Sequence, residues 1–185
     1  DVDPSAIMQA EQELLREGTS IEELQRLCDV HSALFHGSAT DAQKLHSKDI
    51  QDQRLSAAAA LIQISGHPLQ TFTLENAALE KLIARAKQVL ENGTINDGSL
   101  NELRQIAIHY ARKGDLLYPH LKVQYGISGP SAVMWTVDDE IRDELNALAK
   151  QKDQKETDAW KQRLNAVLTR MEEMIYKESN ILFPN

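Results

Sequence analysis

Two histidines and three acidic residues have side chains that could bind a metal ion together: His67, Glu75, His109, Asp138 and Glu178. Imidazole and carboxylate groups in one site suit iron, manganese or zinc better than calcium, which takes oxygen ligands. Glu75 follows His67 by eight residues. That spacing is about 80° around an α-helix, so both side chains could face one cavity. These residue types predict a metal site if the fold brings the five positions together.

Each of these residues also has a plainer interpretation. His109 is the most suggestive, because apolar residues surround it in the sequence, yet a buried histidine can simply be hydrogen-bonded in a core. His67 precedes a proline at the start of a helical segment and could be an exposed cap. Asp138 could belong to a solvated face, and Glu178 beside Lys177 could be ordinary surface charge. The sequence leaves both interpretations open.

A repeated segment carries two of these residues. His109–Pro119 aligns with Met174–Pro184, 65 residues later, as (His/Met)-x3-(Lys/Glu)-x2-(Leu/Ile)-Leu-aromatic-Pro. Each copy is typical of the end of an amphipathic helix that a proline stops. A doubled motif of this kind is typical of two-fold symmetric metal-binding bundles, although two ordinary bundle helices could share it by chance.

Four long helices are expected to position these side chains, over about 68–91, 99–117, 131–150 and 156–182. Segment 119–130 is expected to be a long connection. The buried stripe of the first helix is expected at Leu74, Ala78, Leu82, Ala86 and Val89, and that of the fourth at Trp160, Leu164, Val167, Met171 and Ile175. With no strand pattern, the sequence predicts an all-α fold, an up-down four-helix bundle over 51–185.

A small helical module is expected to precede the bundle, over 1–50. Gly18 should end its first helix, and Ser20 with Glu23 should form a capping box for the second. A further helix is expected from about 50 to 64. Cys28 and His31 lie one turn apart, but two ligands are too few for a zinc site, so packing is the favoured interpretation.

Composition limits the possible partners. The net charge of -8 and the lack of a basic block argue against nucleic-acid binding. No apolar run is long enough to span a bilayer, and one cysteine cannot form an internal disulfide, so we expect a cytoplasmic protein. The missing initiator methionine leaves open that the chain is a piece of a longer protein. A homodimer is also left open.

The sequence resembles bacterial hemerythrin-like proteins of the HHE cation-binding type over about 54–184. The resemblance rests on His67-Pro-Leu-Gln70, the His109 segment, Gly126-Ile-Ser-Gly-Pro130, Asp139-Glu-Ile-Arg142 and Tyr176-Lys-Glu-Ser179. The stretch before residue 54 resembles a helical domain of unknown function that precedes such a bundle in some of these proteins. A sensory PAS domain often follows in proteins of this kind. The resemblance implies a non-haem di-iron centre, used for oxygen or nitric oxide sensing, iron handling or repair. The candidate ligands in this chain would suffice for one metal ion or for a weak pair.

The match to the family's ligands is incomplete. His67 and His109 stand where the family has histidines, and Glu178 is kept. Other family ligands are replaced, at Gln70, Lys113-Gly114, Asp138, Met174 and Ser179. Lys113 would place a positive charge near the cavity and oppose a cation, unless its side chain reaches outward to solvent.

Three functions follow as hypotheses. The first is a metal-binding sensor or regulator in which His67, His109, Asp138 and Glu178 bind iron and Glu75 supports or ligates it. The second is a metal-free structural or interaction module of a larger signalling protein. The third is haem binding in the same cavity through a histidine or Met174. Enzymatic activity has the least support, because the sequence indicates no substrate and no general base.

Overall fold

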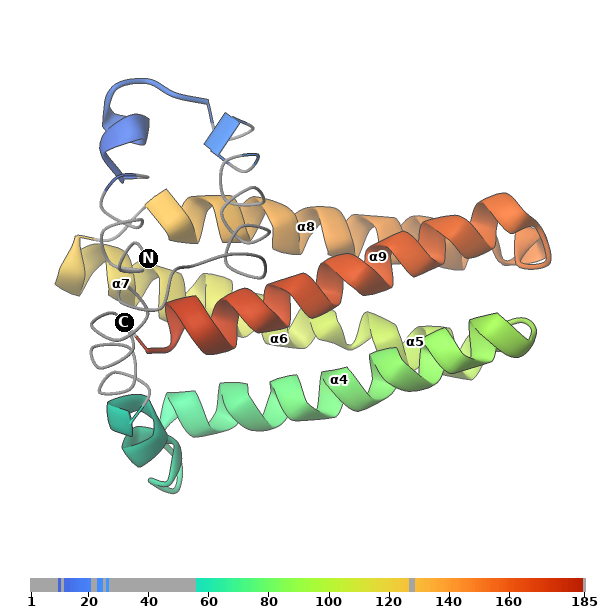
Figure 1. The fold of residues 1–185 in the computed structure, drawn as a ribbon, viewed down its shortest axis with the longest axis horizontal. Helices are drawn as coiled ribbons and strands as arrows, with labels where there is room; N and C mark the ends of the chain where they lie inside the picture. Colours follow the sequence, from blue (N-terminus) through green and yellow to red (C-terminus); the bar gives the residue numbers. More distant parts are fainter. Residues whose placement is uncertain are drawn as a thin grey trace, which may run out of the picture.

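The computed structural model describes residues 10, 12–20, 23, 24, 26, 56–126 and 129–184. Within these residues every regular element is helical (Figure 1). The elements are α4 (Pro68–Asn92), α5 (Asp97–Arg104), α6 (Ile106–Arg112), η1 (Lys113–Leu117), α7 (Tyr118–Tyr125), α8 (Gly129–Lys150), η2 (Lys152–Gln154), α9 (Asp158–Lys177) and η3 (Glu178–Leu182). The all-α prediction is confirmed.

Four rods run side by side along the long axis of the molecule (Figure 1). The first is α4, the second is the series α5–α6–η1–α7, the third is α8, and the fourth is α9 with η3. α4 contacts α9 and α5, and α8 also contacts α9 and α5, so each rod has two neighbours. Short turns at 93–96 and 151–157 reverse the chain, which gives the expected up-down bundle.

Polar caps fix where the rods begin. The Asn96 side chain accepts a hydrogen bond from the Ser99 N–H (2.8 Å), and the Thr157 hydroxyl accepts one from the Trp160 N–H (3.3 Å). Each bond satisfies a backbone donor that has no partner within its helix. The turn from α4 to α5 and the turn from α8 to α9 lie at the same end of the bundle (Figure 1).

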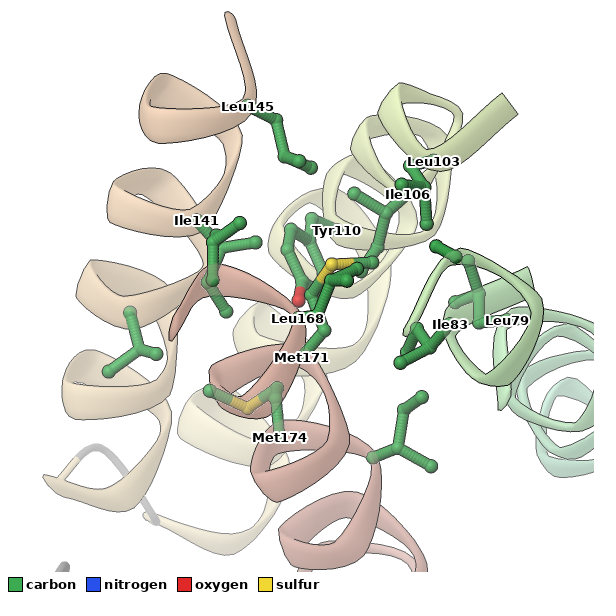
Figure 2. Close-up of a cluster of buried hydrophobic side chains, with 14 of the residues drawn as sticks. Leu79, Ile83, Leu103, Ile106, Tyr110, Ile141, Leu145, Leu168, Met171 and Met174 are labelled. Carbon is green, nitrogen blue, oxygen red and sulfur yellow. The ribbon is translucent and has the colours of Figure 1, made fainter. Parts of the chain in front are cut away.

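An apolar core fills the space between the rods. Figure 2 shows side chains from all four meeting there, with Tyr110 and Met171 among them. All five residues expected on the buried side of the fourth helix are buried: Trp160, Leu164, Val167, Met171 and Ile175. The stripe expected for the first helix was right in part. Ala86 is buried and Leu82 and Val89 pack against the core, but Ala78 is exposed and Leu74 is 65% exposed. The fully buried apolar residues of α4 are Phe72, Leu79, Ile83 and Ala86, so the buried face is turned from the expected one at the start of the helix.

Two π-helical turns interrupt the second and fourth rods at the repeated segment. In η1 the Tyr118 N–H donates to the Lys113 carbonyl, and in η3 the Phe183 N–H donates to the Glu178 carbonyl (2.8 Å). Both bonds span five residues instead of four, and both turns end directly before an aromatic–proline pair.

The expectation that Pro119 stops the second helix was therefore wrong. α7 continues from Tyr118 to Tyr125, with Pro119 in its first turn. A proline is tolerated there, because the first turn of a helix does not need its N–H groups, and η1 ends the preceding hydrogen-bond series. Residues 119–125 are helical, and not part of a long connection.

The described part of the N-terminal region agrees with two local predictions. Gly18 has φ 94°, a left-handed conformation that ends the helical stretch before it. The Glu23 N–H donates to the Ser20 hydroxyl (3.2 Å), as in a capping box. The helix expected over 50–64 is described at 56–62. Cys28 and His31 lie outside the described residues. Among the helices that are described, none is long and apolar enough to span a membrane.

Candidate functional site

A buried lysine lies between two carboxylates at one end of the bundle. The Lys113 ammonium donates to Asp138 Oδ1 (2.8 Å) and to Glu178 Oε1, and Lys113 and Glu178 are 0% exposed. Lys113 is the first residue of η1, Asp138 lies on α8, and Glu178 is the first residue of η3. The ammonium is also 4.4 Å from the centre of the Tyr110 ring, within the range of a cation–π interaction. Lys113 thus joins three of the four rods.

His109 joins the remaining rod to this ion pair. Its Nδ1 is 2.8 Å from Glu75 Oε2 on α4, and its Nε2 is 2.9 Å from Glu178 Oε2. An imidazolium satisfies both contacts, because both of its N–H groups can donate. Glu75 also pairs with Arg112, and the Phe72 ring lies nearly perpendicular to the imidazole, 5.6 Å between centroids. The histidine is therefore held at both nitrogens and also packs against an aromatic ring.

Tyr118 completes the hydrogen bonding of Asp138. Its hydroxyl donates to Asp138 Oδ2 (2.9 Å), so both oxygens of that carboxylate have a partner. The result is one network through all four rods: Glu75, His109, Glu178, Lys113, Asp138 and Tyr118. A buried polar network is stable only when its members are satisfied, and each of these six side chains has at least one partner.

The two buried carboxyl groups have pKa values shifted in opposite directions. Burial would raise the pKa of Glu178, but the nearby charges of Lys113 and His109 and their hydrogen bonds outweigh burial and hold this pKa at about 2. For Asp138 burial dominates and raises the pKa to about 6, although Lys113 opposes that rise. Glu178 is thus the firmly charged partner of the lysine, whereas Asp138 takes up a proton in mildly acidic solution.

Charges of opposite sign face each other within this cluster. Three carboxylates, on Glu75, Asp138 and Glu178, face the cations of Arg112 and Lys113 and the imidazole of His109. Such pairing matters here, because an unpaired charge in the interior carries a large desolvation penalty.

Four of the five predicted site residues meet in this network: Glu75, His109, Asp138 and Glu178. His67 instead caps α4, with its Nδ1 accepting a hydrogen bond from the Leu69 N–H (3.2 Å). Glu75 pairs with His109 and Arg112, so it supports the histidine from the side away from Lys113. Whether any of these residues binds a metal ion stays a prediction.

Two network residues were not predicted as site residues. Lys113 was considered only as a charge that opposes a cation, although its alignment with Glu178 in the repeat was a usable signal. Tyr118 aligns with Phe183, and only its hydroxyl distinguishes it as a hydrogen-bond donor. Met174, the counterpart of His109, is buried in the apolar core (Figure 2), which leaves its sulfur among hydrocarbon side chains.

The side chains as they stand do not fit a metal centre of iron and imidazole. The Lys113 ammonium bonds the carboxylate oxygens of Asp138 and Glu178 that a metal ion would need, and one imidazole is present in the network. In the described parts of the chain, no group of three or more His, Cys, Asp or Glu side chains is arranged to hold a metal ion. Lysine, by contrast, provides its positive charge without any metal.

The fold and its polar centre define a class: an all-α four-helix bundle that carries a buried cluster of one histidine, carboxylates and a lysine. Residues 67–185, more than half of the chain, match the model of the hemerythrin HHE cation binding domain, and the chain belongs to that family. Residues 1–41 match a family of unknown function. No curated protein and no solved structure gave a significant match. Cation binding, with iron as the usual metal, is the property that the family suggests.

Proposed function

We propose that this chain is a metal-independent hemerythrin-like module with a regulatory or interaction role in a cytoplasmic signalling protein. The observation that carries the proposal is the Lys113 ammonium, which lies fully buried between Asp138 and Glu178. In this role the ion-pair network supplies what a bound cation would supply: a positive charge that holds carboxylates from different helices together.

Competition between the ammonium and a metal ion supports this proposal. A metal ion could bind Asp138 and Glu178 only after the Lys113 ammonium had left both oxygens. The lysine is attached to the protein, so it competes at a high effective concentration. Its displacement would also leave a cation buried without its partners, or force its side chain out of a packed core. Both effects disfavour metal binding.

Metal analysis of the purified full chain tests the proposal. Protein produced with added iron and purified without oxygen or chelator should contain well under one metal ion per chain. Its melting temperature should be the same with and without chelator, because no bound metal contributes to folding. One tightly bound iron per chain that disappears in a His109→Ala variant would overturn the proposal.

A metal-binding sensor is the second candidate. It is favoured by the convergence of His109, Asp138 and Glu178 in one buried network, and by the family's cation binding. In that case Lys113 would swing away when iron binds, and oxygen, nitric oxide or redox state would be the signal. The metal analysis separates the two candidates, since only the sensor retains iron through His109.

A further inference from the structure

The outer face of the second rod carries a shallow groove of about 430 Å³. Its lining residues come from α6 and η1: Ala107, Ile108, Ala111, Arg112, Asp115 and Leu116. Ile108 and Leu116 are large apolar side chains that are more than half exposed. Exposed apolar side chains that gather in a hollow with charged groups beside them are typical of an interaction site.

The lining residues form two rows with opposite properties. Residues four apart on a helix lie above one another and form a ridge along its surface. One row is Ala107, Ala111 and Asp115, and the other is Ile108, Arg112 and Leu116. The first row is small, small and acidic, whereas the second is large, basic and large. Each row is therefore the complement of the other in both size and charge.

The two charged residues of the groove can still accept partners. Asp115 is exposed, and no ion pair to its carboxylate is found within the part of the chain that the structure describes. Arg112 pairs with Glu75 through one terminal nitrogen, and its side chain is 46% exposed. A guanidinium has five N–H donors, so this pair leaves others for a second carboxylate. The groove thus offers one cation and one anion.

We infer that this groove binds the same groove of a second copy of the chain, with the two rods parallel and related by a two-fold axis that runs along them. Such an axis sets each row of one copy against the other row of its partner. Ile108 then fits between Ala107 and Ala111 of the second copy, and Arg112 faces Asp115 of the second copy. Each contact occurs twice. An antiparallel pair would set each row against itself, so that alanines met alanines and large side chains met large ones.

Charge favours a second copy over a partner of a single sign. An acidic partner would leave Asp115 facing like charge, and a basic partner would do the same to Arg112. The groove is small for a permanent interface, so we expect a weak, reversible dimer with a dissociation constant in the micromolar range.

Arg112 connects this surface to the interior. Glu75 bonds both Arg112 and Nδ1 of His109, so one carboxylate lies between the groove and the buried network. Dimerisation goes beyond the proposed function, and the two can fail separately. Metal analysis does not report on association, and the mass of the particle does not report on bound iron.

Sedimentation of the full chain tests the inference, from micromolar to several hundred micromolar protein. The salt concentration should be about 0.15 M, which screens the long-range repulsion between two chains of net charge -8. The weight-average mass of the wild type should rise with concentration toward twice the mass of one chain. A wild type that stays monomeric over this range would overturn the inference, whichever other partner then binds the groove.

Leu116→Lys should weaken the dimer at least about tenfold, because it removes an apolar contact twice and adds two like charges. Leu74→Lys is the matched control. Leu74 is as exposed as Leu116, 65% against 66%, but it lies on α4 and does not line the groove. Its substitution should leave the dissociation constant unchanged. Equal weakening by both variants would show that the dimer forms elsewhere and would overturn the inference.

Charge reversal tests the parallel arrangement. Asp115→Arg sets arginine against Arg112 in both halves of the dimer and should weaken it about tenfold. Arg112→Glu should weaken it in the same way, by setting two acids together. A mixture of these two variants should form a heterodimer, because every facing pair is then of opposite charge.

Circular dichroism shows whether each variant is folded. If Arg112→Glu does not fold, because it loses its bond to Glu75, Asp115→Arg alone decides. A folded Asp115→Arg chain that dimerises as tightly as the wild type would overturn the parallel pairing, and weakening would support it.

Discussion

Replacing Lys113 with methionine should strongly destabilise the bundle. Methionine keeps most of the length and volume of the lysine stem, so the main change is the loss of the ammonium and its bonds. Asp138 and Glu178 then remain buried, 2% and 0% exposed, with their charges uncompensated. The substitution therefore measures what the cation contributes, with little change in packing.

The structure sets the size of this effect. Removal of one partner of a buried ion pair typically costs about 3–5 kcal/mol, whereas an exposed pair contributes about 0–1 kcal/mol. Lys113 has no exposed surface and two carboxylate partners, so the upper range applies. The loss should be smaller at pH 5 than at pH 8, because both carboxyl groups become easier to protonate once Lys113 no longer lowers their pKa values.

Urea unfolding followed by circular dichroism provides the measurement. Lys87→Met is the control, because Lys87 pairs with Glu172 (2.5 Å) at a partly exposed position on α4 and should lose no more than about 1 kcal/mol. A cycle that combines Lys113→Met with Glu178→Gln should give a coupling energy of about 2–3 kcal/mol. A loss for Lys113→Met as small as that for Lys87→Met would refute the role given to the ammonium.

Three further predictions concern this network and the glycine that follows Lys113 in the chain. Tyr118→Phe removes the donor to Asp138 and should lower the free energy of unfolding by about 1.5–3 kcal/mol in urea; a loss below about 0.5 kcal/mol would contradict the hydrogen bond. Stability measured against pH should reflect both carboxyl groups. Glu178, with its pKa lowered to about 2, should contribute roughly 3 kcal/mol to the free energy of unfolding above pH 4.3. This contribution is lost as the pH falls toward 2, and Glu178→Gln should abolish the loss. Asp138, with its pKa raised to about 6, should change stability with pH in the opposite direction. Its contribution to the free energy of unfolding is complete below about pH 3.9 and is lost as the pH rises through 6. An Asp138→Asn chain whose stability keeps this pH dependence would contradict the assignment. Gly114→Ala should change stability by no more than about 1 kcal/mol, because the added Cβ would meet the Trp135 ring at an ordinary 3.6 Å; a larger loss in urea would show that the glycine is required.

The bundle could be predicted from sequence because its signals are local. Helical periodicity, turn residues and side-chain caps act within a few residues, and together they mark four long helices. The predicted end of the second helix was wrong, because a proline can either end a helix or stand at the start of its next segment. Which of these happens at Pro119 depends on the π-turn before it, and a 3.6-residue pattern gives no sign of that turn.

The site could be predicted only in part, for a physical reason. Histidine and acidic residues on apolar helix faces are unusual enough to stand out, and His109, Asp138 and Glu178 do meet. Lysine is less informative, since its long stem can carry the charge to solvent or leave it inside. For Lys113 the outcome depends on partners 25 and 65 residues away, which no local pattern reveals. His67 is ambiguous in the same way, because a cap and a ligand look alike in sequence.

The two π-turns explain why the repeat predicts architecture better than chemistry. Each turn needs a backbone that can accept a five-residue hydrogen bond before a proline, and that need is independent of the side chain at its first position. The side chains at Lys113 and Glu178 are constrained differently, because both are fully buried and their charges must compensate each other. A lysine that faces a glutamate meets this requirement. The alignment of the two segments therefore predicts their shared backbone geometry, but not which charge stands at each position.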